Sequence, residues 1–116
     1  MTVAAYRKIA DQIEQPLHLG ITEAGGLIGV GFWTDVTCGE GITAIADAIR
    51  YGIDQFGIDH IALGSDWDGS VTTPIDASQL PHLTQALLDK GLSEAEVRAV
   101  MGGNMARFLA QHLPPG

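Results

Sequence analysis

The sequence predicts an α/β fold in which a parallel β-α-β unit precedes a helical C-terminal part. Two short apolar segments, 26–33 and 60–64, flank a stretch whose apolar residues recur at helical spacing. A helix between two strands, joined by short connections, favours parallel pairing of those strands. Beyond residue 77 only the helical spacing continues. The 116 residues, 46% of them apolar, suffice for one small globular unit with a core.

The first half of the chain supplies the elements of the β-α-β unit. Apolar residues at steps of three and four in 6–17 predict a short helix that stops near Pro16. The apolar run 26–33 (GLIGVGFW), with its interspersed glycines, is typical of a strand that is buried on both faces and lies close to another backbone. In 42–56 the apolar residues share one helical face, which predicts the clearest helix of the chain, and Gly57 is placed to cap its end.

A long polar loop separates the second strand from the C-terminal helices. Residues 60–64 (HIALG) predict a short buried strand, whereas 65–77 is too rich in Asp, Gly, Ser, Thr and Pro for a regular element. Loops of this kind often carry functional groups. Three helices follow, and their boundary signals are Gly91 as an end, a capping box of Ser93 and Glu96, and Asn104 as an N-cap.

Composition argues against several classes of partner. Fourteen acidic residues against six basic ones give a net charge of −8, which disfavours contact with nucleic acid or with an anionic membrane. No apolar run reaches the roughly 18 to 20 residues of a membrane span, and no targeting segment is apparent. The single cysteine, Cys38, cannot form an internal disulfide. We therefore expect a reducing compartment, with a cytoplasmic location as the default.

The strongest candidate site is the segment 62–69 (ALGSDWDG), because it places two carboxylates just beyond a parallel strand. α/β folds bind ligands at that end of their strands. There Asp66 or Asp68 can ligate a metal ion, accept a proton from bound water, or bind a substrate ammonium group. The competing interpretation is that both side chains only form Asx turns that shape the loop. An EF-hand is excluded, since no glutamate closes a twelve-residue loop and a strand precedes the aspartates.

The histidines do not extend this site. His60 begins the predicted strand and Asp66 follows its end, so that about 20 Å of extended chain separates them. The two residues cannot share a metal ion, and we expect His60 to be packed or hydrogen-bonded at the far end of the sheet. His82 and His112 are expected at the surface, and His18 lies in no confidently predicted element.

Four other residues invite a functional interpretation. Trp33 and Trp67 each stand at the predicted C-terminal end of a strand, where an aromatic ring can border a pocket, with packing in the core as the equal alternative. Cys38 has no obvious histidine partner, which favours an inert thiol over a nucleophile. Before Asn104 stand two glycines, but neither the strand nor the lysine of a phosphate loop accompanies them, so a helix cap is the simpler role.

Four ordered blocks of the sequence resemble the closing part of the membrane dipeptidase family. They are 25–30 (GGLIGV), 57–69 (GIDHIALGSDWDG), the leucines of 83–88, and 101–107 (MGGN followed by Arg107). Their order and spacing match, and the resemblance extends over about residues 24–113, with details in 31–33 and 71–74 that are most similar to the bacterial branch. Residues 1–23 are unassigned.

This resemblance implies a (β/α)₈ barrel in which two zinc ions activate a bridging water to hydrolyse dipeptides. It implies that Asp66, beyond the last strand of the barrel, handles the proton of the attacking water. It also implies that Asp68, Gly69 and Trp33 lie near the substrate.

The family's metal ligands all precede the matched region, so the resemblance assigns no metal ligand to this chain. A full barrel takes at least about 200 residues, so residues 1–116 are expected to be a single partial domain with about two of the eight strands. We therefore expect no dipeptide hydrolysis by the chain alone, and we expect an upstream segment or a homo-oligomer as its partner, with a dipeptide as the substrate once the site is completed. The alternatives are a non-catalytic remnant, a subunit of a split enzyme, and another barrel amidohydrolase.

Overall fold

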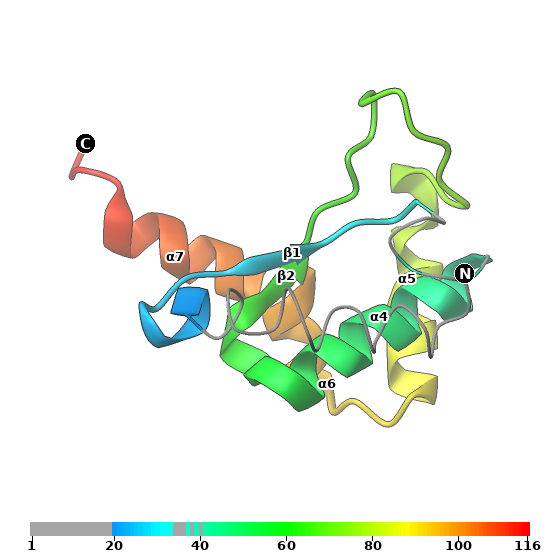
Figure 1. Cartoon of the computed structure of the whole chain (residues 1–116), viewed down its shortest axis with the longest axis horizontal. Helices are drawn as coiled ribbons and strands as arrows, with labels where there is room; N and C mark the ends of the chain where they lie inside the picture. Colours follow the sequence, from blue (N-terminus) through cyan, green and yellow to red (C-terminus); the bar gives the residue numbers. More distant parts are fainter. Residues whose placement is uncertain (1–19, 34–36, 38, 40) are drawn as a thin grey trace.

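A parallel β-α-β unit lies at the centre of the computed structural model, which describes residues 20–33, 37, 39 and 41–116 (Figure 1). Strand β1 (Ile28–Val30) pairs in parallel with β2 (Ile61–Leu63), and helix α4 (Gly41–Phe56) connects them. This confirms the predicted α/β class and the parallel pairing. The helix expected in 6–17, together with His18 and Cys38, lies outside the described residues.

Both strands are shorter than the apolar runs that predicted them. The backbone N–H of Gly26 donates to the carbonyl of Ile21 at 2.8 Å, so Gly26 belongs to the turn after the helical residues 20–23 rather than to β1. At the other strand His60 belongs to the 3₁₀ turn η2 (Ile58–His60), and β2 begins one residue later. Hydrophobicity marks which residues are buried, whereas the hydrogen-bonding partners decide where a ladder begins.

The glycines of the two strands allow their backbones to approach closely. A Cβ atom on Gly64 would lie 3.3 Å from the carbonyl carbon of Gly29, and the N–H of Gly64 donates to the carbonyl of Val30 at 2.9 Å. A Cβ atom on Gly52 of α4 would lie 2.9 Å from Cδ1 of Ile61, so this glycine lets the helix pack against β2. The close backbone approach expected from the glycines is therefore present.

Local capping signals determine where several helices begin and end. The C-terminal elements are η3 (Ala77–Gln79), α5 (Leu80–Asp89), α6 (Glu94–Arg98), the π turn η4 (Ala99–Gly103) and α7 (Asn104–His112). The predicted capping box is present, because Glu96 Oε1 accepts from the N–H of Ser93 at 2.9 Å and Ser93 Oγ accepts from the N–H of Glu96 at 3.2 Å. Gly57 and Gly91, which follow α4 and α5, have φ values of 94° and 89° that favour glycine.

The prediction that Asn104 caps a helix is wrong. Asn104 has helical backbone angles (φ −62°, ψ −44°) and is fully buried. The chain is kinked at Gly102 within η4, Asn104 is the first residue of α7, Gly103 stands in the N-cap position, and no side-chain cap hydrogen bond is made at this helix start. The side-chain amide instead donates to backbone carbonyls near the start of β2.

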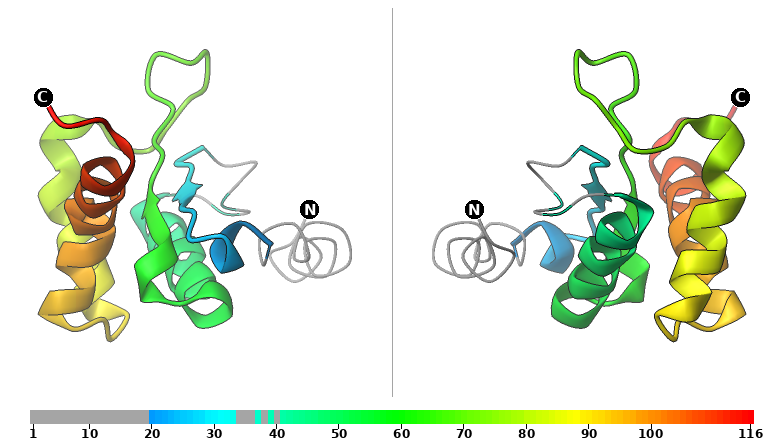
Figure 2. Two further views of the ribbon diagram at one scale, coloured as in Figure 1. Left: turned by 90° about the vertical axis from the view of Figure 1, so that its left-hand side faces the viewer. Right: turned by 90° about the vertical axis from the view of Figure 1, so that its right-hand side faces the viewer.

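The core lies where β2 packs between α4 and the C-terminal helices (Figure 2). Strand β2 contacts α4 as well as η4 and α7, and α4 also packs against α5. The side chains with at most 1% exposure include Phe32, Ile45, Ile49, Ile61, Leu83, Leu87 and Val100. Burial of such side chains is the main source of stability, and here it fixes the short strand β2 between α4 and the C-terminal helices.

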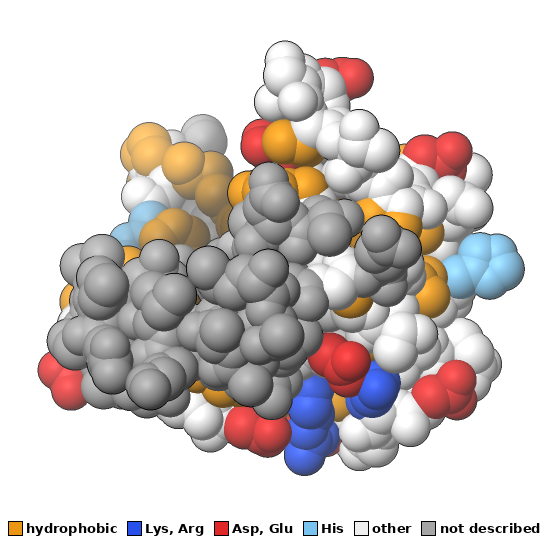
Figure 3. Space-filling model, turned by 45° about the vertical axis from the view of Figure 1, so that its right-hand side comes forward, with side chains coloured by type: hydrophobic (Ala, Val, Ile, Leu, Met, Phe, Trp, Pro, Cys, Tyr) orange, Lys and Arg blue, Asp and Glu red, His pale blue; other side chains and the backbone are white. Residues whose placement is uncertain are grey.

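The surface agrees with the acidic composition. Acidic side chains occur over the visible face of the molecule and on the loop that projects from it (Figure 3). His82 and His112 are exposed, as expected. Within the described part of the chain, we find no helix that is both long enough and apolar enough to cross a membrane.

Candidate functional site

The candidate site lies at the edge of the sheet where both strands end. Because Val30 pairs with Leu63 in parallel register, β1 and β2 finish at the same edge. Trp33 lies three residues after Val30, and Asp66 lies three residues after Leu63, so the two residues have equivalent places beyond their strands. Residues in this position are those that α/β folds use to bind ligands. The structure therefore brings both predicted site segments to one edge.

Asp66 presents an exposed carboxylate directly beyond β2. Its φ of 60° places it in the left-handed region, and the turn that follows is closed by the N–H of Gly69, which donates to the carbonyl of Asp66 at 3.0 Å. Among the described residues the Asp66 carboxylate has no hydrogen-bond or ion-pair partner, so an Asx turn is not what shapes this loop. Both carboxylate oxygens can therefore serve as acceptors for a ligand or for a proton.

Gly69 is required by the position of Asp66. A Cβ atom on Gly69 would lie 2.7 Å from Oδ1 of Asp66 and 2.8 Å from its carbonyl oxygen, both far inside normal contact distance. Only a residue without a side chain fits beneath this carboxylate. The Asp66 side chain and the turn that carries it are therefore matched to a glycine at position 69.

Trp67 anchors the base of the loop in the protein. Its Nε1–H is shared between Thr73 Oγ1 at 3.2 Å and the carbonyl of Ile75 at 3.0 Å, and its ring packs edge to face against Phe32. The hydroxyl of Thr73 in turn donates to the same Ile75 carbonyl at 2.8 Å. Of the two sequence-based interpretations of Trp67, the structure supports packing against the core.

The tip of the loop projects away from the helical body (Figures 1 and 2). Asp68 and Ser70 are exposed and have φ values of 65° and 64°. Because Trp67 points inward, the neighbouring Asp66 and Asp68 are left on the surface. The predicted substrate-binding residues Asp68 and Gly69 thus lie on an exposed loop next to Asp66.

Trp33 is half-buried and folds back over its own strand end. A Cβ atom on Gly31 would lie 2.3 Å from Cζ3 of Trp33, so the indole covers the backbone of that glycine. The carbonyl of Trp33 accepts from the N–H of Thr37 at 3.1 Å. The ring therefore packs over Gly31 near the end of β1, and its place beside the substrate stays a prediction.

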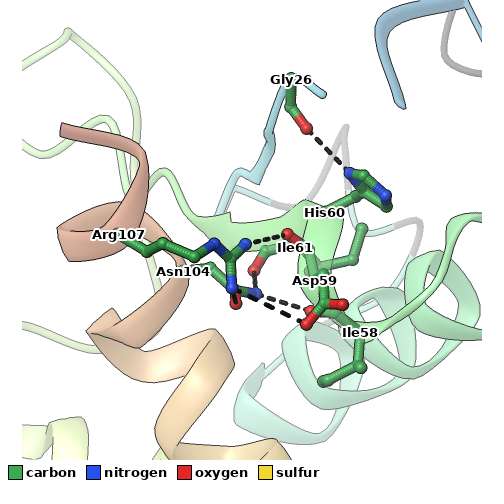
Figure 4. A network of polar contacts seen from close by, with 7 residues as sticks. All are labelled: Gly26, Ile58, Asp59, His60, Ile61, Asn104 and Arg107. Atoms are coloured by element: carbon green, nitrogen blue, oxygen red, sulfur yellow. Dashed lines mark hydrogen bonds and ion pairs between the residues drawn. The ribbon is translucent and has the colours of Figure 1, made fainter. Parts of the chain in front are cut away.

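His60 lies at the opposite edge of the sheet, as expected. Its Nδ1 is 3.0 Å from the carbonyl oxygen of Gly26, which requires the tautomer protonated at Nδ1 (Figure 4). A shallow pocket at this edge is lined by Gly25, Asp59, His60, Arg107, Phe108 and Gln111. His60 is therefore a structural residue of the sheet and does not reach Asp66.

Within the residues that the structure describes, no three His, Cys, Asp or Glu side chains come together in a group that could hold a metal ion. Zinc sites in enzymes use three protein ligands and a water molecule. The described residues therefore do not by themselves form a zinc site.

Two contributions to the site were not expected from the sequence. The hydrogen bonds of Trp67 to Thr73 and Ile75 close the loop, and the buried amide of Asn104 contacts the segment before β2. Both depend on residues that are distant in sequence or that meet only after folding. In the sequence, only the apolar Trp67 between the charged Asp66 and Asp68 indicates that the base of this loop is packed inward.

Comparison with known proteins gives the family of the chain. The sequence model of membrane dipeptidases (peptidase family M19) matches residues 6–113. Dipeptidase aclJ of Aspergillus oryzae is 34% identical over 111 residues, which cover 89% of this chain and 25% of that protein. Dipeptidase ataJ of Aspergillus terreus is 33% identical over 113 residues, covering 90% of this chain and 27% of that protein.

A shorter similarity leads to a different protein. The 4-hydroxy-3-methylbut-2-en-1-yl diphosphate synthase (flavodoxin) of Saccharophagus degradans is 49% identical over 69 residues, which cover 59% of this chain and 18% of that synthase. The identity is higher, but the shared segment is a small part of the synthase. The dipeptidase similarity extends over far more of this chain.

Solved structures agree with the dipeptidase comparison. The crystal structure of dipeptidase AC, a metallopeptidase of family M19, has a TM-score of 0.74 at 28% identity and covers 82% of this chain and 31% of that one. An amidohydrolase from Pseudomonas aeruginosa has a TM-score of 0.72 at 26% identity, covering 82% of this chain and 38% of that one. The chain thus spans only about a quarter to a third of the dipeptidases that it matches, and it belongs to the membrane dipeptidase family, peptidase family M19.

Proposed function

We propose that this chain supplies the closing strand and the proton-accepting carboxylate of a dipeptide hydrolase. The observation that carries the proposal is the exposed Asp66 carboxylate beyond the C-terminal end of a parallel strand, in a chain of the membrane dipeptidase family. Catalytic groups of barrel enzymes stand at this end of their strands. The surrounding barrel and the dipeptide substrate belong to the same proposal, since the chain spans only part of its relatives.

In the proposed reaction a water molecule attacks the carbonyl carbon of the peptide bond, and Asp66 accepts the proton that this water loses. The tetrahedral intermediate then releases the amine, which leaves with a proton as the carbon–nitrogen bond breaks. A carboxylate that accepts and returns one proton balances both steps. Asp68 is assigned to the substrate in the same proposal, because a carboxylate on this exposed loop suits the free ammonium group of a dipeptide.

The family is one of metallopeptidases, and we propose that zinc is the metal of the completed site. The described residues do not fit a zinc ion on their own, because they bring no three ligating side chains together. The proposal therefore requires ligands from outside the described residues. Asp66 is assigned the proton only, and its role is tested without reference to metal geometry.

The first experiment measures the chain by itself. Purified 116-residue protein is incubated with zinc and a panel of dipeptides, and bound zinc is determined by elemental analysis after dialysis. We expect no hydrolysis above background. Turnover together with two firmly bound zinc ions would instead show that the chain carries a complete site.

The second experiment supplies the rest of the site. Residues 24–113 replace the matching segment of the Aspergillus oryzae dipeptidase, and the chimera is assayed with dipeptides. We expect activity that Asp66→Asn lowers by about 10² to 10⁴ in kcat, since Asn keeps the shape but cannot accept the proton. Zinc content and folding should stay unchanged. A near-normal kcat for Asp66→Asn in an active chimera would remove Asp66 from the mechanism.

A further inference from the structure

A buried side-chain amide connects α7 to the segment that leads into β2. Asn104 is fully buried, and its Nδ2 donates to the carbonyl oxygens of Ile58 at 2.6 Å and of Ile61 at 2.8 Å (Figure 4). These two carbonyls are brought to one side by the 3₁₀ turn η2 between them. Both donors of the amide are thereby used on the backbone of one short segment.

Arg107, one helical turn further along α7, extends the same contact. Its Nη2 donates to the carbonyl of Asp59 at 2.8 Å, and its Nη1 donates to Oδ1 of Asn104 at 3.3 Å. Its ion pair with the Asp59 carboxylate, at 3.7 Å between exposed groups, contributes little. Asn104 and Arg107, here called the carbonyl clamp, thus hold the backbone of Ile58, Asp59 and Ile61 from one helix.

The clamp acts at the start of a short strand and adds to the packing of α4, η4 and α7 around it. β2 contains three residues, and its one neighbour among the described strands is the equally short β1. A slip of one residue in such a strand moves every side chain to the opposite face. Here a slip would take Ile61 out of the core and leave the Asn104 amide buried without acceptors, which folded proteins avoid.

The clamp lies at the start of β2, and the candidate site lies beyond the other end of the same strand. Asp66 lies five residues after Ile61, so about 16 Å of extended chain connects the two. On this path the backbone runs through β2 in register with β1, and Gly64 is still hydrogen-bonded to Val30. The register at the start of β2 therefore determines where Asp66 leaves the sheet.

We propose that Asn104 and Arg107 are positioning residues for Asp66, because they fix the register of β2 from the edge of the sheet opposite the site. The importance of Asp66 rests on the function proposed above, whereas the effect of the clamp on its position does not. The test therefore measures the position of Asp66 first and the catalytic activity second.

The position is read by amide NMR spectra of the full 116-residue chain. Asn104→Asp keeps the size of the side chain but removes both Nδ2 donors. Ser93→Ala, which removes the cap of α6 and none of the hydrogen bonds of the clamp, serves as a control of general destabilisation. We expect Asn104→Asp to shift the amide signals of Ser65 and Asp66 and the indole signal of Trp67, and Ser93→Ala to leave them in place. Equal shifts in both variants would overturn the proposal.

Arg107→Met covers the case in which Asn104→Asp does not fold. This variant keeps the aliphatic stem of a half-exposed side chain and removes only the donors to Asp59 and Asn104. We expect smaller shifts at Ser65 and Asp66 in the same direction as in Asn104→Asp. Unchanged signals there, with altered signals confined to 58–61, would limit the clamp to a local structural role and overturn the proposal.

The chimera described above gives the second readout. A displaced proton acceptor reduces the rate of the chemical step while the substrate still binds, so Arg107→Met should lower kcat by roughly 10-fold to 100-fold with KM nearly unchanged. Ser93→Ala should leave both constants unchanged. An inactive chimera with an intact clamp would contradict the proposed function alone, whereas a changed KM at constant kcat would contradict the positioning role.

Discussion

The indole of Trp67 meets the ring of Phe32 edge to face, with ring centroids 5.7 Å apart and ring planes at 78°. This contact joins the loop after β2 to the segment after β1. Because Trp67 stands between Asp66 and Asp68, its inward position keeps both carboxylates on the surface. The same residue therefore stabilises the base of the loop and orients the charged groups beside it.

The first prediction concerns the hydrogen bonds of Trp67. In Trp67→Phe an aromatic ring remains against Phe32, but the bonds from Nε1 to Thr73 and Ile75 are lost. The indole N–H is a single donor shared by two acceptors, and one such bond contributes about 0.5 to 1.5 kcal/mol net, so we expect the free energy of unfolding in urea to fall by about 1 kcal/mol. Limited proteolysis within 68–72 should become faster.

Thr73→Ser is the matched control for this change, because it keeps the hydroxyl that accepts from Trp67. We expect its proteolysis rate to match that of the unmodified chain. If Trp67→Phe were cleaved no faster than Thr73→Ser, the indole hydrogen bonds would not be what closes the loop.

The second prediction compares two substitutions in the turn after Asp66, one at Gly69 and one at Asp68. In the active chimera, Gly69→Ala should lower kcat by more than 10-fold, since the new methyl group collides with the Asp66 carboxylate and its carbonyl. Asp68→Asn removes a charge from the exposed tip and should raise KM more than it lowers kcat. Steady-state kinetics with one dipeptide separates the two effects. Similar losses of kcat in both variants would argue against a special place for Asp66.

The third prediction concerns the capping box of α6. The pKa of Glu96 is lowered below its usual value, first because its carboxylate accepts from the backbone N–H of Ser93, and then because of the Ser93 hydroxyl and the positive charge of Arg50. A depressed folded-state pKa stabilises the protein above the unfolded-state value of about 4.5, and this contribution is lost as the pH falls through the folded-state pKa.

Glu96→Gln provides the comparison, because the amide oxygen can still accept from Ser93 but does not titrate. Thermal unfolding followed by circular dichroism between pH 7 and pH 3 should show a larger loss for the unmodified chain than for Glu96→Gln below about pH 4.5. Parallel pH profiles of the two proteins would mean that this carboxylate does not contribute to the pH dependence.

The fourth prediction concerns the strand edges. Among the described residues β1 and β2 pair only with each other, so each has one edge without a backbone partner. Such edges favour association with other strands. We expect the purified chain to form oligomers or aggregates, measured by light scattering over a concentration series, with a thermal midpoint that rises with concentration. A strictly monomeric sample with a cooperative, concentration-independent transition would contradict this expectation.

The sequence alone predicted the elements whose signals are local. The helical face of 42–56 is α4, and the Ser93–Glu96 box begins α6. The alternation of strand and helix correctly predicted the parallel pair. Asp66 was found by its place after an apolar strand, although its role at that place stays a prediction.

The features that the sequence did not predict depend on contacts between distant residues. Asn104 follows two glycines, a pattern that also fits a helix N-terminus, and only the packing of α7 against β2 shows that its amide is buried. The length of β1 was overestimated because Gly26 is bonded to Ile21 before it can join the sheet. In both cases a competing hydrogen bond, which has no local sequence signal, decides the structure.

The bonds between Trp67 and the pair Thr73 and Ile75 close the loop at its base, and this has a consequence for how the protein can change. Residues 70–72 lie outside that closure and beyond the glycine that the Asp66 carboxylate requires, so their number and kind can vary without disturbing the core. A different tip sequence would alter which molecules are met at this edge of the sheet. The segment between Gly69 and Thr73 is therefore the natural insertion point for evolution or for protein engineering, as long as both ends are kept.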